Sequence, residues 1–173
     1  MTLLLNQAFM NPLTMSALHK PSYHDRQSFP VDVINEYESL VIDEDKIKFV
    51  CGKIVSDAGY RSGRLGVVLT DNVAIHTLNS KYLGHDYVTD VISFTVERSE
   101  THLEAEVVVS VEVAGERCQE FDQDAEKEIL LYIIHGTLHQ VGYDDKTKYD
   151  SQIMRQMEAA YLALFDLLSF EED

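Results

Sequence analysis

The chain has 173 residues, is 45% hydrophobic and carries a formal net charge of −16. Its length supports one good hydrophobic core and is short for two, so we expect a single globular domain. The acidity argues against broad, nonspecific nucleic-acid binding, which depends on Lys and Arg neutralising phosphates. Any contact with RNA therefore requires a local basic patch or a metal ion.

The cysteines and the apolar segments indicate where the protein works. Cys51 and Cys118 lie far apart, and neither has a partner at metal-ligand spacing, which favours reduced, buried thiols over a disulfide. No basic leader precedes the first apolar residues, and no uninterrupted apolar run is long enough to cross a bilayer. We therefore expect a cytoplasmic protein that makes no membrane contact.

Hydrophobic periodicity divides the chain into an N-terminal extension and one domain. Residues 1–29 show no sustained period and are expected to be poorly ordered, whereas residues 30–173 form the domain. Alternating apolar residues predict strands at 31–34, 64–70, 91–96 and 103–113, the last of them central or heavily covered. Helical spacing and acidic starts predict helices at 43–60, 71–84, 112–121, 122–141 and 148–168. This order predicts an α+β fold in which helices cover a small sheet.

The motif His135-Gly-Thr-Leu-His139 lies in an apolar run and precedes Gly142 and two acidic residues. Imidazoles four residues apart project from one face of a helix and can bind one metal ion. A glycine after the second histidine permits a left-handed turn that brings a carboxylate back toward the pair. Three protein ligands leave one coordination position open, as in catalytic zinc sites. We interpret His135, His139 and Asp145 as a metal site.

Other roles for these residues stay open at this point. Paired histidines on an apolar helix can be core residues bonded to backbone, and Asp145 can cap the last helix while Asp144 serves as the ligand. An iron oxygenase also uses two histidines and a carboxylate, but nothing else in the chain indicates a site for an oxidative cosubstrate. Gly136 occupies the position at which metallopeptidases carry a general-base glutamate, so peptide hydrolysis is disfavoured.

The same residues resemble the signature of the YbeY family of ribosomal-RNA maturation endoribonucleases, in which a His-Gly-x-Leu-His helix is followed by Gly-Tyr-Asp-His. The resemblance covers about residues 30–165 and includes further segments, namely Leu78-Asn79-x-x-Tyr82-x-Gly84-x-Asp86-x-x-Thr89-Asp90-Val91-Ile92-Ser93-Phe94, Glu106-Val-Val-Val-Ser110 and Met154-x-x-Met157-Glu158. Asp145 stands where the family usually has a third histidine, and Leu83 where it usually has an arginine. A guanidinium there would grip a phosphate bidentately, which leucine cannot do.

The resemblance implies a small mixed sheet covered by helices, a zincin-like metal-dependent hydrolase architecture, with the paired-histidine helix buried. It implies one Zn²⁺ per chain and single-strand-specific endoribonuclease activity, acting on the 3′ end of small-subunit ribosomal RNA and in ribosome quality control. The implied partners are ribosomal RNA, the ribosome or its proteins, and a GTPase. The alternative is a weakly catalytic or noncatalytic metal-binding factor associated with the ribosome.

The expected chemistry is attack of a metal-activated water on a phosphodiester. A zinc ion held by two imidazoles and a carboxylate lowers the pKa of a bound water toward ~7 and polarises a phosphoryl oxygen. Asp144 is the candidate general base, with Asp90 and Glu106 as alternatives if the fold brings them within reach. The candidates for lining the substrate cleft are Thr89, Ser93, Ser110 and His85.

Overall fold

Four strands form one mixed sheet in the order β1-β2-β4-β3 in the computed structural model, which describes residues 29–37, 39–121 and 124–169. The parallel strands are β1 (Val31–Asn35), β2 (Ser62–Thr70) and β4 (His102–Ser110), and β3 (Val91–Arg98) pairs antiparallel with β4. The predicted α+β fold with a small mixed sheet is confirmed. β4 lies between β2 and β3, as its β-branched sequence indicates.

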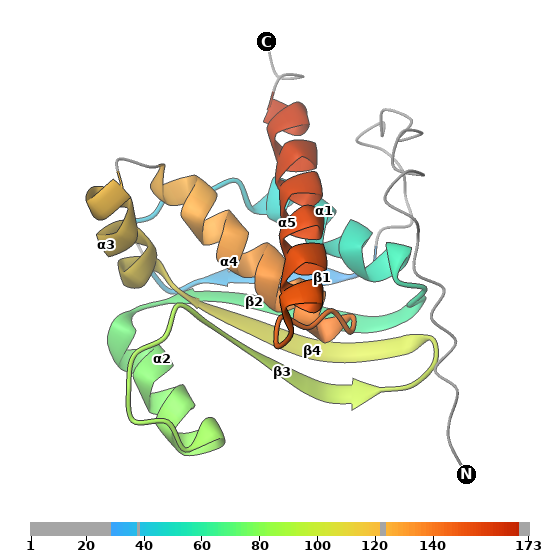
Figure 1. The fold of residues 1–173 in the computed structure, drawn as a ribbon, viewed down its shortest axis with the longest axis horizontal. Helices are drawn as coiled ribbons and strands as arrows, with labels where there is room; N and C mark the ends of the chain where they lie inside the picture. Colours follow the sequence, from blue (N-terminus) through green and yellow to red (C-terminus); the bar gives the residue numbers. More distant parts are fainter. Residues whose placement is uncertain (1–28, 38, 122–123, 170–173) are drawn as a thin grey trace.

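Helices cover both faces of this sheet unequally (Figure 1). One face carries α1 (Glu44–Asp57), α4 (Ala125–Gln140) and α5 (Lys148–Ser169), which also pack against one another. The other face carries α2 (Asn72–Leu78), which continues into the π-helical segment η2 (Asn79–Leu83), and α3 (Val111–Phe121) follows β4 beside α4. No helix in these described ranges is long and apolar enough to span a membrane.

Aspartate side chains begin three of the helices, as expected for residues that accept hydrogen bonds from free backbone N–H groups. Asp43 accepts from Lys46 N at 3.0 Å and Asp71 accepts from Ala74 N at 2.8 Å. Asp124 accepts from Glu126 N at 3.0 Å and begins the helix that carries the paired histidines. The predicted helix starts at residues 43 and 71 are confirmed, and α4 begins slightly later than predicted.

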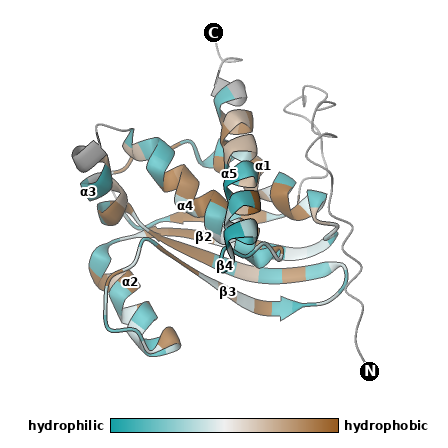
Figure 2. Cartoon of the chain, viewed as in Figure 1, coloured by the Kyte–Doolittle hydropathy of each residue, from teal (hydrophilic) through white to brown (hydrophobic). Residues whose placement is uncertain are grey.

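The main hydrophobic core lies between the sheet and α1, α4 and α5. Figure 2 shows hydrophobic residues along α4 and the strands near it. α4 is almost wholly buried, as predicted, because no side of its apolar run faces water; Ile129, Ile133, Ile134 and Leu138 are each at most 1% exposed. A smaller cluster of Ile75, Ile92 and Val108 lies beneath α2 on the other face. Cys51 and Cys118 are free and buried, as predicted.

Gly136 sets how closely α4 approaches the sheet. A Cβ atom at this position would lie 2.7 Å from Val107 Cγ1 on β4 and 3.0 Å from Val91 Cγ2 on β3. Both neighbours are β-branched side chains in paired strands, which have little freedom to move aside. The absence of a side chain at Gly136 therefore lets α4 lie directly on the two strands.

Several boundaries differ from the predictions, and three of the differences have a clear structural reason. The predicted strand 103–113 ends at Ser110, because Ser110 Oγ accepts from Val113 N at 3.2 Å and the chain enters α3. The predicted helix 71–84 changes to π-helical geometry at Asn79 before ending at Gly84. Phe29 is only 4% exposed and packs in the core, so it belongs to the domain and not to the extension. The remainder of that extension, residues 1–28, lies outside the described residues.

Two helical glycines give a matched test of the packing at Gly136. Gly136→Ala should destabilise the protein by about 1–2 kcal/mol, because overpacking outweighs the ~1 kcal/mol gain in helix propensity. Gly115→Ala in α3 has no heavy atom within 4 Å of the added Cβ and should stabilise by up to ~1 kcal/mol. Chemical denaturation of both variants measures the difference. Equal stabilisation by both substitutions would show that α4 does not require glycine here.

Candidate metal centre

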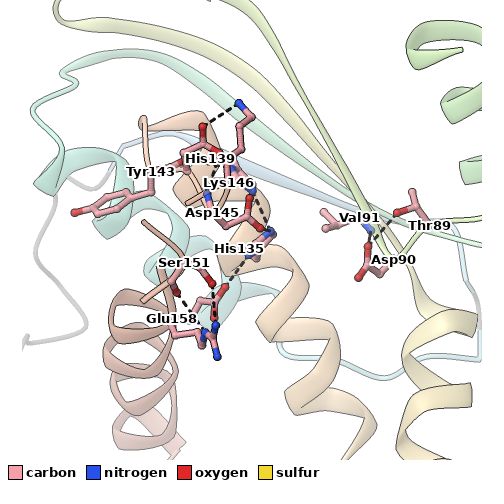
Figure 3. Close-up of polar contacts among 12 residues, drawn as sticks. Thr89, Asp90, Val91, His135, His139, Tyr143, Asp145, Lys146, Ser151 and Glu158 are labelled. Atoms are coloured by element: carbon pink, nitrogen blue, oxygen red, sulfur yellow. Dashed lines mark hydrogen bonds and ion pairs between the residues drawn. The ribbon is translucent and has the colours of Figure 1, made fainter. Parts of the chain in front are cut away.

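The paired histidines meet at the C-terminal end of α4. The Nε2 atoms of His135 and His139 lie 3.0 Å apart, and the two rings are nearly perpendicular at 89°. One helical turn separates the residues, so both imidazoles project from one side of α4, as the four-residue spacing predicts. Figure 3 shows both side chains on the part of α4 that faces the turn carrying Asp145.

Hydrogen bonds at the Nδ1 atoms orient both rings. His139 Nδ1 donates to the backbone oxygen of Tyr143 at 3.0 Å, and His135 Nδ1 donates to Glu158 Oε1 on α5 at 2.7 Å. With each proton on Nδ1, both Nε2 lone pairs point toward each other. Two lone pairs at this distance repel each other unless a proton or a metal cation is shared between them.

The turn after α4 brings a carboxylate to the same point. Gly142 adopts φ +104°, and Tyr143 N donates to Leu138 O at 3.0 Å, which reverses the chain at the helix end. Asp145 Oδ2 then lies 3.9 Å from His135 Nε2. Asp145 does not cap the last helix, because Thr147 Oγ1 accepts from Asp150 N at 3.1 Å and fills that role.

The donor set fits one metal ion. One ligand atom from each of His135, His139 and Asp145 lies within 4.8 Å of the others. Two nitrogens bound tetrahedrally at ~2.0–2.1 Å to the same ion lie roughly 3.3 Å apart, which is close to the Nε2 separation. Two neutral imidazoles and one carboxylate also leave a coordination position for water or substrate. The geometry is therefore that of an open metal site.

Acidic neighbours favour the charged form of His135 when no metal is bound. The hydrogen bond that His135 donates to Glu158 raises the pKa of His135 above its ordinary value, burial opposes this, and the charges of Glu158, Asp145 and Asp90 add to the increase. The same negative charges attract a divalent cation. A metal ion and a proton thus compete for the same pair of nitrogens.

The three candidate bases occupy different environments. Asp144 accepts from Asp145 N at 2.8 Å and pairs with Lys146 at 2.9 Å, and the lysine lowers the pKa of the Asp144 carboxyl. Glu106 neighbours Val107 on β4, whose side chain contacts α4, so Glu106 projects from the opposite face of the sheet and is not within reach. Asp90 lies near enough to influence His135, and Figure 3 shows it beside α4 at the start of β3.

The residues predicted to line the substrate cleft also lie in different environments. Ser110 is 0% exposed and donates to Asn72 Oδ1 at 2.6 Å, so it supports the fold and cannot line a surface cleft. Ser93 pairs with Val107 and therefore shares the face of the sheet that α4 covers. Thr89 donates to Asp90 Oδ1 at 3.1 Å, and His85 lies in the exposed loop before it.

Glu158 is the functional residue to which the sequence assigned no role. It follows Met154 and Met157 in a segment that resembles the YbeY family, but only the packing of α5 against α4 places it behind His135. A carboxylate in this position fixes the ring and increases the basicity of the metal-binding nitrogen. The family-like segment was the available signal, because no local pattern links residues 135 and 158.

A small mixed sheet that packs against a buried helix with converging histidines, followed by a ligand-bearing turn, is a metal-dependent hydrolase architecture. A model of the Endoribonuclease YbeY family matches residues 32–166. The chain belongs to this family.

Individual relatives agree with this assignment. An Endoribonuclease YbeY of Salinibacter ruber is 36% identical over 141 residues, covering 77% of this chain and 90% of the relative. One from Christiangramia forsetii is 34% identical over 135 residues, covering 78% and 94%. The solution structure of TM1509 from Thermotoga maritima is similar with a TM-score of 0.56 at 25% identity, covering 78% of this chain and 88% of that one.

Removing the third ligand should weaken metal binding. Asp145→Ala is expected to raise the Kd for Zn²⁺ by ~10-fold or more, because a direct bond to the ion is lost. Competition with a chromophoric chelator measures the change. The control is Asp32→Ala, which removes a carboxylate on β1 that pairs with Arg64 on β2. It should leave the Kd unchanged. Undiminished affinity in Asp145→Ala would exclude this residue as a ligand.

Removing the charge behind His135 should also weaken binding. Glu158→Gln is expected to raise the Kd for Zn²⁺ by about 10- to 100-fold while Glu100→Gln, in an exposed turn, has no effect. In metal-free protein, Glu158→Gln should lower the pKa of His135, which an NMR titration of the imidazole measures. The His135–Glu158 contact stabilises the metal-free fold at pH values below the ordinary histidine pKa. This stabilisation is lost as the pH rises through the raised pKa of His135. An unchanged His135 titration would contradict this role for Glu158.

Proposed function

We propose that the chain is a metal-dependent endoribonuclease that cleaves single-stranded ribosomal RNA, acting at the 3′ end of small-subunit RNA and in ribosome quality control. The convergence of His135, His139 and Asp145 in a member of the YbeY family is the observation that carries this proposal. Curated relatives bear the name Endoribonuclease YbeY, which supports RNA as the substrate. Cytoplasmic location and contacts with the ribosome, ribosomal proteins and a GTPase are parts of the same proposal.

We assign one Zn²⁺ per chain to the three ligands. Nitrogen and carboxylate donors in a tetrahedral arrangement with one open position are the set that catalytic zinc sites use. When bound, the ion supplies Lewis-acid polarisation of a phosphoryl oxygen and makes water more acidic. The remaining chemistry belongs to the side chains around it.

The surrounding protein groups fix the tautomers of the two imidazoles and provide a proton acceptor. Glu158 and the Tyr143 backbone oxygen keep both imidazoles in the tautomer whose Nε2 is free to bind. Asp90 is the candidate base on the sheet side of His135, where it holds Thr89 and Val91 N by hydrogen bonds. A carboxylate at this position is suited to accept a proton from a water that attacks the phosphodiester.

RNA cleavage tests the proposal directly. Zinc-supplemented protein should cleave a fluorescent single-stranded RNA and leave the same sequence intact in a duplex. His139→Ala and chelator treatment should each abolish cleavage because the metal is lost, whereas His102→Ala at the start of β4 should retain it. Elemental analysis of the same preparations measures zinc. Cleavage that persists in the zinc-free His139→Ala variant would overturn the proposal.

One observation favours the alternative of a noncatalytic metal-binding factor. Leu83 is 48% exposed at the position where the signature that the chain resembles usually has an arginine, so the chain lacks a guanidinium for phosphate at this point. Leu83→Arg separates the two functions. A large gain in cleavage by this variant over a weakly active parent would show that the chemistry is intact and only phosphate binding is reduced. No cleavage by either protein would favour the noncatalytic factor.

A further inference from the structure

Two aromatic rings lie stacked at the surface of the loop between η2 and β3. The His85 and Tyr87 ring centroids are 5.3 Å apart with an interplanar angle of 13°, and Tyr87 Oη lies 3.3 Å from His85 Nδ1. Tyr87 remains 56% exposed. The pair therefore presents a flat aromatic surface to solvent, which folding alone does not explain because exposed aromatic area adds nothing to the core.

The loop is held in this conformation by its neighbours. Asn79 is only 1% exposed, and its Nδ2 donates to the backbone oxygen of Tyr87 at 2.9 Å. Asn79 O accepts from His85 N at 3.3 Å, and Ser80 Oγ donates to His85 O at 3.2 Å. A buried amide thus fixes the backbone on both sides of the ring pair. Rings held in this way lose less conformational entropy when they bind a ligand.

Exposed apolar residues flank the two rings in the sequence. Leu83 is 48% exposed and Val88 42% exposed. Asp86, which separates His85 and Tyr87 in the sequence, has a side chain that is 93% exposed and lies 2.8 Å from His76 Nε2. A chain of net charge −16 repels phosphate, but the face of an uncharged base is not repelled by it. The ligand that suits this surface is therefore a planar, aromatic group.

The same loop leads directly to the metal centre. Tyr87 precedes Val91 by four residues, and Val91 Cγ2 would lie 3.0 Å from a Cβ atom at Gly136, the residue that follows His135. Four residues of chain span at most ~14 Å. A strand of RNA whose phosphodiester lies at the metal centre can therefore extend along this loop to the rings.

We propose that the His85–Tyr87 pair is a subsite that stacks against an unpaired base of single-stranded RNA next to the cleaved bond. This inference rests on the proposed endoribonuclease function. Stacking requires a free base face, so the subsite rejects paired nucleotides, whose faces are covered by their neighbours. It is tolerant of sequence because every base has a π face. Stacking thus adds affinity for RNA in a region where Leu83 cannot bind a phosphate group.

Binding of a short, fluorescently labelled single-stranded RNA with cleavage-resistant phosphorothioate linkages to zinc-supplemented full-length protein tests the subsite. Tyr87→Ala should raise the Kd from fluorescence anisotropy by about 5- to 150-fold, the range typical of one lost base–aromatic stack. Tyr87→Phe keeps the ring and should stay close to the parent. Tyr149→Ala removes a more exposed tyrosine, 71% exposed in the first turn of α5, and should leave the Kd unchanged. Circular dichroism confirms that each variant is folded, and a gel confirms that the RNA is intact.

A second RNA that lacks one base distinguishes stacking from other effects of the variant. Abasic substitution at the stacked nucleotide should weaken binding to the parent by a similar factor and have no effect on Tyr87→Ala, because both changes remove the same contact. If the parent cleaves RNA while Tyr87→Ala binds as tightly as the parent, the subsite is wrong and the proposed function stands. If the parent neither binds nor cleaves single-stranded RNA, the proposed function fails and the subsite with it.

Discussion

The close contact between α4 and the sheet at Gly136 is the constraint on which the site depends. A helix that lies directly on Val91 and Val107 presents His135 and His139 at a fixed height above the strands. The same contact excludes a glutamate beside the first histidine, because any side chain at position 136 would collide with β3 and β4. A proton acceptor in the proposed reaction must therefore come from outside α4, and Asp90, whose charge contributes to the raised pKa of His135, is the residue proposed for this role.

Local patterns predicted the parts of this site that short-range geometry determines. The four-residue histidine spacing, the glycine turn at Gly142 and the buried character of α4 follow from helix geometry and backbone sterics. The role of Glu158 could not be predicted, because it depends on how α5 packs across α4. Ser110 was misplaced because a polar residue at a strand end looks the same whether it meets substrate or caps the next helix.

In the proposed enzyme, RNA binding depends on two contributions, the charge of a metal ion and the stacking of bases. A bound metal ion would supply positive charge in a small area of a chain whose formal net charge is −16. Proteins that bind RNA through many Lys and Arg contacts lose affinity steeply as salt rises. A protein that combines one metal–phosphate contact with stacked bases depends less on those contacts, so an acidic body and RNA cleavage are compatible.

The metal ligands come from two segments that the fold joins only at the end of α4. His135 and His139 belong to the helix, Asp145 belongs to the turn, and Glu158 behind them belongs to α5. A bound ion would therefore hold the turn before α5 against the end of α4, and metal present at 100 times its Kd would add about 2.7 kcal/mol to the stability of the native state. Starvation for the metal would then lower the abundance of the protein through turnover of unfolded chains, and not only its activity.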